Sequence, residues 1–358
     1  LVTGDVKTAY RSLFTSAGLL TQEVIFGREY SKELSAFHET SWYYYSPTYG
    51  TKIAMTKKFM NTYLTTKGTP FTDIDGYKTI DFIHEFDGRD ARMAQTVISP
   101  TYKMKISGRE RLYSPNWKVT RTGYHPIKWS IDDDADNVLS KAASWNSLPI
   151  IRYAEVLLNY AEAKAELGTL TQNDLVITVN EIRSRVGMRG LDMNEANKNI
   201  DWYLESKEYG YPNVTGANKG VILEIRRERT VELIQEGFRL QDLYRWKAGY
   251  CIDQAISGMY FPGPGEYKLA GKETADLILY KAGETKPQAG EGVSVYELGS
   301  DIILSEGDKG YVYYHKTVEN LRTPFNEERD YLYPIPSGER SLNPNLTQNP
   351  GWSDGLDF

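Results

Sequence analysis

The spacing of apolar residues predicts a mainly helical chain with one long helix at its centre, from Val221 to Trp246. One face of this helix is apolar at both ends and charged in the middle. The charged positions are Arg229, Glu232, Glu236 and Arg239. Because buried charges are stable only when they are paired, we expect these four side chains to form an ion-pair ladder that ties the helix to its neighbours.

The two glutamates of this face allow a second interpretation. Glu232 and Glu236 are one turn apart, which places their Cβ atoms roughly 6 Å apart, close to the carboxyl separation of a retaining glycosidase. Carboxylates on successive turns of one helix point the same way, however, and two arginines stand ready to neutralise them. The pattern favours a structural role, and a glycoside hydrolase using this pair is the alternative.

A helical hairpin is predicted upstream of the long helix. Apolar positions from Ile151 to Ala165 predict a helix that begins at Ser147-Leu148-Pro149 and ends at Gly168. Thr171 and Asp174 form a capping-box pattern that begins a second helix, which ends at Gly187. The unit has the length of a tetratricopeptide repeat, about 34 residues, although the usual Trp-Leu-Gly-Tyr pattern is absent. A single repeat cannot bury its apolar face alone, so we expect further repeats to precede this chain.

The remaining segments contain short elements separated by Gly and Pro. Residues 1–18 have the pattern of a helix end, and residues 19–146 are predicted to be loop-rich with a strand at Glu23–Phe26. Residues 147–250 are the expected helical repeat core. Residues 251–358 are predicted to form short strands, followed by an extended C-terminal strap over the helices that Trp352 holds in place. The strands are expected at Asp276–Tyr280, Ser294–Leu298 and Gly310–Tyr314.

Aromatic residues are the main candidates for recognition. The chain has 27 Tyr but 11 Phe and 7 Trp, and tyrosine suits a hydrated binding surface better than a dry core. The richest stretch ends at Pro47 and Gly50, which predicts a loop. It forms either a hydrophobic plug or a set of exposed rings that stack on sugars. The candidate ligand-binding residues are Trp42, Tyr43, Tyr44, Tyr45 and Tyr49, with Tyr113 and Trp117 on a second surface.

Other kinds of chemistry have little support in the sequence. A net charge of −6 without a basic cluster argues against nucleic acid as a partner. The single cysteine, Cys251, excludes an internal disulfide and a multi-cysteine metal site, and the four histidines lack metal-binding spacing. No nucleophile elbow, phosphate loop or dinucleotide fingerprint is present. We therefore predict a binding protein without catalytic residues, cofactor or metal.

An acidic stretch superficially resembles a calcium loop. Asp132, Asp134 and Asp136 alternate as ligands do at the start of such a loop. Asn137 and Ala143, however, occupy the positions that require Gly and Glu. A solvated acidic turn is the better interpretation.

Several motifs together carry a family resemblance. The chain contains Arg152-Tyr153-Ala154-Glu155-Val156-Leu157-Leu158-Asn159-Tyr160-Ala161-Glu162-Ala163, then Glu228-Arg229, Glu232-Leu233, Glu236-Gly237 and Arg245-Trp246, and closes on Pro-Ile-Pro and Asn-Pro-Gly-Trp. This combination resembles the SusD/RagB family from about residue 20 to the C-terminus. The segment Arg89-Asp90-Ala91-Arg92 also resembles that family, with Ala91 where Pro is usual.

The resemblance implies a non-catalytic lipoprotein on the outer face of the outer membrane of Bacteroidetes. Such a protein captures oligosaccharides, or peptides in some members, for a SusC-like TonB-dependent transporter. Its fold packs tetratricopeptide-type helices against a loop-rich ligand face. The lipidation cysteine and early repeats of the family are absent here, so membrane association is expected only through an N-terminal lipid anchor outside this chain. The matching motifs belong to the scaffold and assign no binding residue, and a repeat scaffold for protein partners remains a third hypothesis.

Overall fold

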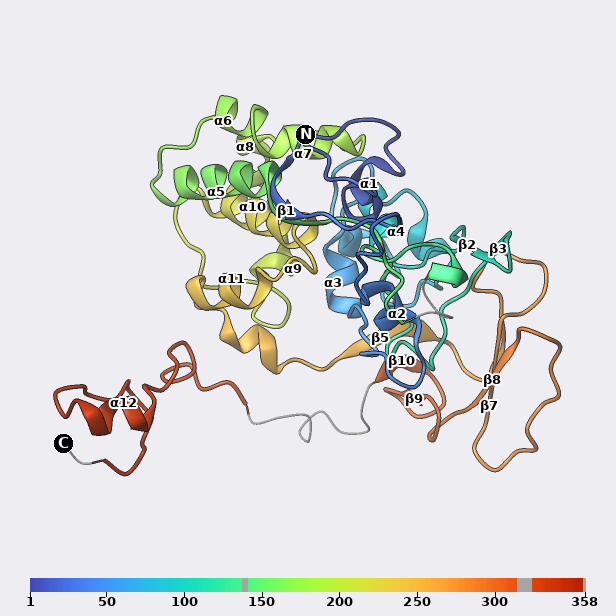
Figure 1. The fold of residues 1–358 in the computed structure, drawn as a ribbon. Coiled ribbons are helices and arrows are strands. Elements are labelled where there is room, and N and C mark those ends of the chain that lie inside the picture. Colours follow the sequence, from blue (N-terminus) through green and yellow to red (C-terminus); the bar gives the residue numbers. More distant parts are fainter. Residues whose placement is uncertain (137–140, 314–323, 357–358) are drawn as a thin grey trace.

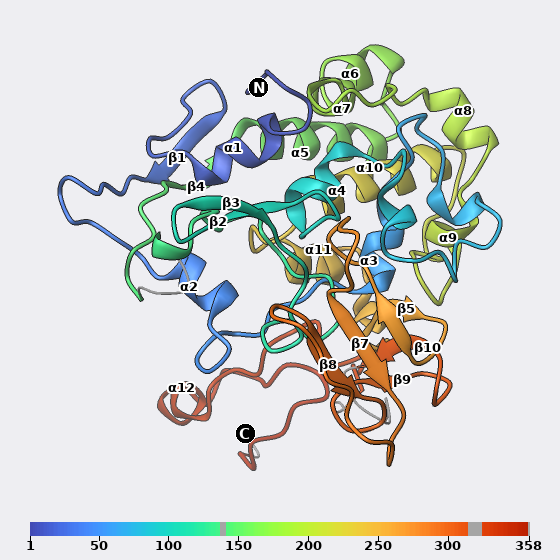
Figure 2. The ribbon, with the colours of Figure 1, turned by 90° about the vertical axis from the view of Figure 1, so that its right-hand side faces the viewer.

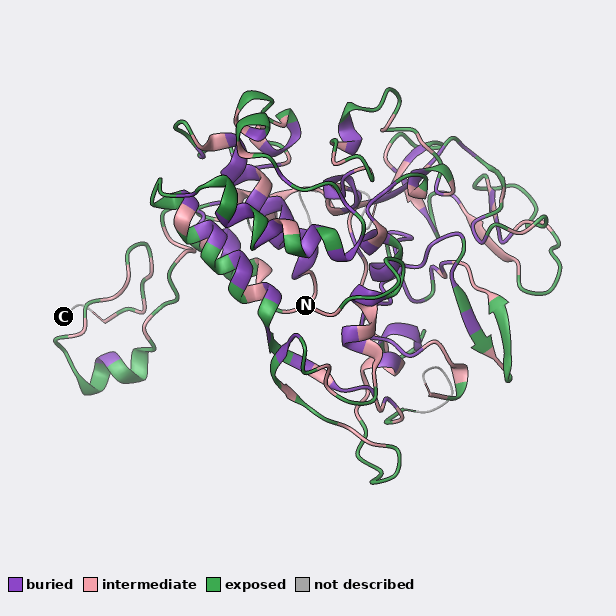
Figure 3. Cartoon of the chain, turned by 90° about the horizontal axis from the view of Figure 1, so that it is seen from above, coloured by how far each residue is buried: buried purple, intermediate pink, exposed green. Residues whose placement is uncertain are grey.

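The computed structural model describes residues 1–136, 141–313 and 324–356 and confirms a mainly helical fold with short strands (Figure 1). The two longest helices are α5 (Tyr153–Glu166) and α10 (Lys219–Glu232). They pack together with α7 (Val179–Arg185), α8 (Met193–Lys198) and α9 (Trp202–Glu205). Figure 3 shows the buried and exposed faces of these helices. Their apolar stripes form one core cluster that includes Leu158, Ala161, Ile182, Leu223 and Ile225.

The predicted hairpin is present, but its ends differ from the prediction. The capping box of Thr171 and Asp174 is confirmed, and Gly168 has a left-handed φ of 68° just after α5. The prediction of one continuous second helix is wrong, because this segment is divided into α6 (Gln172–Val176) and α7. Thr178 explains the division, since its Oγ1 donates to the carbonyl of Asp174 at 2.5 Å and competes with helical bonding.

The first helix of the hairpin does not begin at Ser147 as predicted. Residues Leu148–Arg152 form strand β4, which pairs antiparallel with β1 (Val24–Arg28), and α5 begins only at Tyr153. Strand β1 was predicted, but its partner β4 was not. Strand β4 forms by pairing with a segment more than 100 residues away in the sequence. A local helical pattern cannot detect such a pairing.

The prediction of one continuous helix from Val221 to Trp246 is also wrong. Helix α10 ends at Glu232, and α11 (Arg239–Arg245) follows a turn. Within this turn Gln235 and Gly237 have φ values of 62° and 89°. A left-handed backbone cannot continue a right-handed helix, so the apolar periodicity continues through a chain that changes direction.

Shorter helices connect the helical core to the remainder of the chain. These are α1 (Ala9–Thr15), α2 (Thr40–Tyr45), α3 (Lys57–Thr62) and α4 (Ala91–Thr96), with single turns η1 (Phe71–Asp73), η2 (His84–Phe86), η3 (Asp134–Asp136) and η4 (Gly249–Asp253). A hairpin of β2 (Lys103–Ile106) and β3 (Arg109–Leu112) lies among them. Figure 2 shows α3 near the strands of the C-terminal half, where it contacts β5 (Ser257–Phe261).

The predicted strands of the C-terminal half are confirmed within the described residues. One sheet has the order β5–β10–β9, with β9 at Ile303–Leu304 and β10 at Gly310–Tyr313. The other has the order β6–β7–β8, at Gly265–Tyr267, Leu277–Tyr280 and Ser294–Glu297. Figure 2 shows both sheets at the end of the molecule opposite to α5, α6 and α7. Tyr314, the last residue of the third predicted strand, lies outside the described residues.

The C-terminal segment is not the predicted strap over the helices. Tyr331 contacts the body, where its hydroxyl accepts the backbone N–H of Gly249 at 2.9 Å. The chain then leads away from the helices to α12 (Ser337–Leu342), as Figure 1 shows. Trp352 donates its indole N–H to the carbonyl of Leu332 at 2.9 Å. Trp352 therefore stabilises the C-terminal segment internally and does not attach it to the helices, because Leu332 belongs to the same segment.

Close packing of α8 against α10 gives a first testable prediction. A Cβ on Gly220 would overlap the backbone carbonyl of Ala196. Helix propensity favours alanine over glycine by about 1 kcal/mol, but overpacking typically costs about 1–3 kcal/mol. Because the overlap is with backbone, the upper end of that cost applies, and we expect Gly220→Ala to lower the free energy of unfolding in urea by about 2 kcal/mol net of the propensity gain. Gly290→Ala, where a Cβ meets open space, is the control, and equal stability of the two variants would contradict this packing.

Candidate functional site

Glu232 lies at the centre of a buried charge network. Its side chain accepts hydrogen bonds from Arg152 at 2.5 Å, Arg185 at 2.5 Å and Arg92 at 2.9 Å. Glu236 accepts from Lys128 at 2.6 Å and from Arg152 at 2.7 Å. These cations come from α4, β4, α7 and the loop between β3 and η3, so the network joins elements that are distant in sequence. Both carboxylates are neutralised inside the protein.

The predicted ladder within one helix is wrong in its pairing. Arg229 donates to Asp242 at 2.7 Å, and Arg239 donates to the hydroxyl of Tyr211 at 2.7 Å. Among the described residues, no ion pair joins two of the four ladder side chains. The break at Gly237 moves Arg239 onto another helix, and arginines of neighbouring elements reach the glutamates first. The expected role of tying the helix to its neighbours is nevertheless what these contacts perform.

The electrostatics of this network do not suit the glycosidase alternative. Burial alone would raise the pKa of Glu232, but Arg185, Arg152 and Arg92 outweigh it and hold that pKa well below its ordinary value. The pKa of Glu236 is also lowered, because Arg152 and Lys128 outweigh the effect of burial. A general acid needs a raised pKa and access to its substrate. Glu232 and Glu236 offer neither.

Several of the predicted binding aromatics are buried. Tyr44, Tyr45 and Trp117 are at most 8% exposed, so the expectation that they present rings to a ligand is wrong. The hydroxyl of Tyr45 lies 2.8 Å from that of Tyr102, and the ring of Tyr113 packs edge-on against both. These side chains fill the core.

Three of the predicted aromatics gather at the surface beside them. Trp42 stacks on Tyr49 with centroids 5.8 Å apart and planes 21° apart, and Tyr43 packs edge-on against Trp42. Tyr49 is 71% exposed. The first half of the aromatic stretch forms helix α2 instead of the predicted loop, because Tyr44 and Tyr45 bury one side of a helical turn while Tyr43 faces outward, whereas residues 46–50 form a loop as predicted. Trp42, Tyr43 and Tyr49 remain a predicted binding surface.

A second group of aromatic rings lines a cleft between α3, α9 and the β5–β10 sheet. This tyrosine cleft has a volume of about 320 Å³. Its aromatic residues are Tyr77, Tyr203, Tyr209, Tyr311 and Tyr313. Its polar and charged residues include Lys57, Lys58, Asn61, Lys78, Glu208, Gln254 and Ser257. Flat rings with polar groups around them form the kind of surface that binds a ring-shaped, hydroxyl-rich ligand.

The rings of the tyrosine cleft are held in place by defined contacts. Tyr203 is buried and stacks on the half-buried Tyr209, with centroids 4.4 Å apart and planes 9° apart. Tyr311 donates its hydroxyl to the carbonyl of Lys78 at 2.7 Å. Burial and a hydrogen bond to Glu208 raise the pKa of Tyr209, so this ring is held from two sides. Asn61 is 8% exposed, and its Oδ1 has no hydrogen-bond partner within the described part of the chain.

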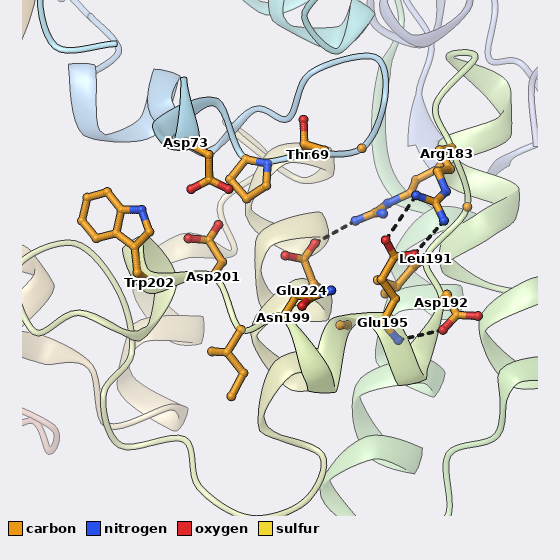
Figure 4. A pocket seen from close by; sticks show the side chains of 16 residues that line it. Thr69, Asp73, Arg183, Leu191, Asp192, Glu195, Asn199, Asp201, Trp202 and Glu224 are labelled. Atoms are coloured by element: carbon orange, nitrogen blue, oxygen red, sulfur yellow. Dashed lines mark hydrogen bonds and ion pairs between the residues drawn. The ribbon is translucent and has the colours of Figure 1, made fainter. Parts of the chain in front are cut away.

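A polar cleft of about 280 Å³ lies beside the tyrosine cleft (Figure 4). Asp73 and Asp201 face one another in it, and Arg183 donates to Glu224 at 3.1 Å on the far side. Trp202 forms part of the wall and is 44% exposed. Its ring also packs at 6.4 Å against both Tyr77 and Tyr209 of the tyrosine cleft. One indole therefore connects the two clefts.

The acidic turn is held by cations of the protein. Asp132 accepts both guanidinium nitrogens of Arg11 at 2.6 Å, Asp133 pairs with Lys105 at 2.9 Å, and Asp136 pairs with Lys32 at 2.7 Å. Asn137 of the calcium-like pattern lies outside the described residues. In the part of the chain that the structure describes, no group of three or more His, Cys, Asp or Glu residues could hold a metal ion. Over the same residues, no helix is both long enough and apolar enough to span a bilayer.

Comparison with known proteins identifies the family. A SusD family model matches residues 22–352. The chain belongs to the SusD family. This confirms the resemblance that the scaffold motifs carry, from Arg152 through the α10 glutamates to the C-terminal Asn-Pro-Gly-Trp. No curated protein sequence matches the chain.

Solved structures share the fold of this SusD family chain. A SusD-like protein from Bacteroides fragilis has a TM-score of 0.61 and 19% identity, with 98% of this chain and 58% of that chain covered. A SusD-like carbohydrate-binding protein from the same species has a TM-score of 0.56 and 23% identity, with 96% and 58% covered. The present chain thus spans less than two thirds of the length of these proteins.

Sequence reasoning missed the tyrosine cleft. Its rings come from the loop after η1, from α9 and the turn behind it, and from β10, which are far apart along the chain. None of these stretches is as aromatic as residues 42–49. The only available signal was the excess of tyrosine, which indicates a recognition surface without giving its position.

Proposed function

We propose that this SusD family chain binds glycans without changing them chemically, and that the tyrosine cleft holds the sugar. The observation that carries this proposal is the set of buried and half-buried rings, with polar groups among them, around the tyrosine cleft of about 320 Å³. Each pyranose has an apolar C–H face that stacks on an aromatic ring, while its hydroxyls need hydrogen-bonding partners at the rim. Asn61, Gln254 and Ser257 supply such partners.

The adjoining polar cleft extends the proposed site. Because Trp202 contacts rings of the tyrosine cleft and also lines the polar cleft, a chain of sugars can cross from one to the other over its indole. The surface of Trp42, Tyr43 and Tyr49 is proposed as a separate, secondary contact for a longer glycan. The name of the carbohydrate-binding structure from B. fragilis agrees with a glycan as ligand, although that name describes the other protein.

The cellular role is proposed from family membership. SusD family proteins hold nutrients at the cell surface, so we place this chain on the outer face of the outer membrane, attached through a lipid anchor. Delivery of the bound glycan to a SusC-like TonB-dependent transporter follows as the proposed next step. The transporter supplies the energy of import, which leaves the chain with the single task of binding.

Replacement of the cleft aromatics tests the proposal. Trp202→Ala and Tyr209→Ala are each expected to weaken oligosaccharide binding about tenfold, since one aromatic contact contributes about 1–3 kcal/mol including its buried area. Isothermal titration with an oligosaccharide selected from a glycan and peptide array gives the affinities. Tyr333→Ala, an exposed ring on the C-terminal segment, is the matched control and should bind like the unaltered chain.

The same titration separates the competing hypotheses. A Trp42→Ala variant that loses binding while Trp202→Ala retains it would move the site to α2. Array signals for peptides alone would replace glycan by peptide as the cargo. Turnover of chromogenic glycans that is abolished by Glu232→Gln would support the glycoside hydrolase instead.

A further inference from the structure

A cationic cavity adjoins the tyrosine cleft. Its volume is about 350 Å³, and it lies between α3, α9, α10, α11 and η4. The two spaces share Lys58, Tyr209, Gln254 and Ala255 in their walls. Most of the lining is apolar or aromatic, and the charged side chains that line it are all cations, namely Lys58, Arg227 and Arg239.

Lys58 lacks a carboxylate partner within ion-pair distance, unlike most of the buried cations of the described chain. Its neighbour Lys57 pairs with Glu85 at 2.7 Å, Lys128 pairs with Glu236 at 2.6 Å, and Arg227 pairs with Asp201. The ammonium of Lys58 is buried and forms no ion pair within residues 1–136, 141–313 and 324–356, where it interacts with the thiol of Cys251 and more weakly with the carboxylate of Glu208. An unpaired charge in such a place destabilises the protein unless something else neutralises it.

Arg239 adds a second charge that no carboxylate neutralises. It donates to the hydroxyl groups of Tyr211 at 2.7 Å and Thr230 at 3.0 Å, and it forms no ion pair among the described residues. Burial, with a smaller contribution from Arg239, lowers the pKa of Lys58 to about 8, and the opposing effects of Cys251 and Glu208 are too small to restore it. Lys58 therefore remains mostly charged at neutral pH, and an anion in the cavity would relieve its repulsion from Arg239.

We propose that this cavity receives the carboxylate or sulfate of an acidic sugar, with Lys58 and Arg239 as its cationic partners. The proposal rests on the proposed function, because the sugar ring enters through the tyrosine cleft. Tyr209 belongs to both walls and can stack on the pyranose while the acidic group reaches Lys58. The unpartnered Oδ1 of Asn61, which lines the tyrosine cleft, accepts a hydrogen bond from a sugar hydroxyl. The chain then selects anionic over neutral glycans.

The test compares matched acidic and neutral ligands by isothermal titration. The probes are oligosaccharides ending in glucuronate, galacturonate or a sulfated hexose, the neutral oligosaccharides of the same linkage, and inorganic sulfate. We expect acidic probes to bind at least tenfold more tightly than neutral ones. Because Lys58 lines both spaces, Lys58→Met should weaken the binding of acidic probes about tenfold more than that of neutral probes, since a hydrogen bond to a charged group is worth about tenfold or more.

Two further variants control the result. Lys58→Arg keeps the charge and should retain most of the preference for acidic probes, whereas Lys118→Met removes an exposed lysine that lines neither space and should change nothing. Equal binding of acidic and neutral probes, unaffected by Lys58→Met, would overturn this inference and leave glycan binding intact. Sulfate binding without any preference among the saccharides would also overturn it. Failure of every saccharide to bind would overturn the proposed function as well.

Discussion

Replacing Glu232 with alanine is expected to lower the free energy of unfolding by about 3–5 kcal/mol, the usual cost of removing one partner from a buried ion network. The carboxylate is fully buried and receives hydrogen bonds from Arg92, Arg152 and Arg185. Its loss leaves three guanidinium groups with less compensation in a region that water does not reach. Urea denaturation followed by far-UV circular dichroism measures the effect.

An exposed glutamate provides the comparison. Glu33 is exposed, and Glu33→Ala should change stability by less than about 0.5 kcal/mol. A similarly small effect of Glu232→Ala would show that the arginines find other partners and that the network is not cooperative. Such a result would also weaken the argument that these carboxylates are structural, and it would reopen their catalytic role.

Acidification is expected to destabilise the protein in two steps. His125 is fully buried, and burial lowers its pKa from an ordinary 6.5 to about 4. Between these values the unfolded chain binds a proton that the folded chain does not, so stability falls as pH decreases, by about 3 kcal/mol in total. Below about pH 4.3 the unfolded carboxylates also take up protons. Glu228, Glu232 and Glu236 have lowered pKa values in the folded state, so their contribution, complete above that range, is lost there.

Urea midpoints at pH 7, 5, 4 and 3 measure both steps. His125→Gln should remove most of the loss between pH 6.5 and pH 4 while keeping the steeper loss below it. His84→Gln is the control, because His84 is exposed and Asp81 raises its pKa, so its removal cannot lessen acid destabilisation. An unchanged pH profile for the His125 variant would show that this imidazole becomes protonated without unfolding.

Local sequence patterns predicted those parts of the fold that local chemistry determines. The Thr171–Asp174 capping box, the end of α5 at Gly168 and the strands of the C-terminal half depend on neighbouring residues, and the structure confirms them. The incorrect predictions concern features that the local apolar pattern does not determine. Strand β4 forms because β1 pairs with it across the chain, and α10 ends where Gln235 and Gly237 adopt left-handed backbone. The periodicity of apolar residues indicates neither the strand pairing nor the left-handed turn.

The candidate site was less predictable for a related reason. A run of aromatics such as Trp42 to Tyr45 is conspicuous in sequence, yet burial of Tyr44 and Tyr45 depends on what packs against them. The tyrosine cleft has no run of its own, because Tyr77, Tyr209 and Tyr311 meet only after folding. Charges follow the same rule: Glu232 was expected to pair along its helix, but arginines from other elements neutralise it.

The composition of the tyrosine cleft from segments near residues 57–61, 77, 203–209, 254–257 and 311–313 has a thermodynamic consequence. A glycan bound in the cleft would contact all five segments, and the unfolded chain would not bind it. Binding would therefore raise the free energy of unfolding of the whole protein. At a hundredfold excess over the dissociation constant this amounts to about 2.7 kcal/mol. If the proposed function holds, the protein with bound glycan should unfold at a higher temperature and resist proteases longer than the protein without it.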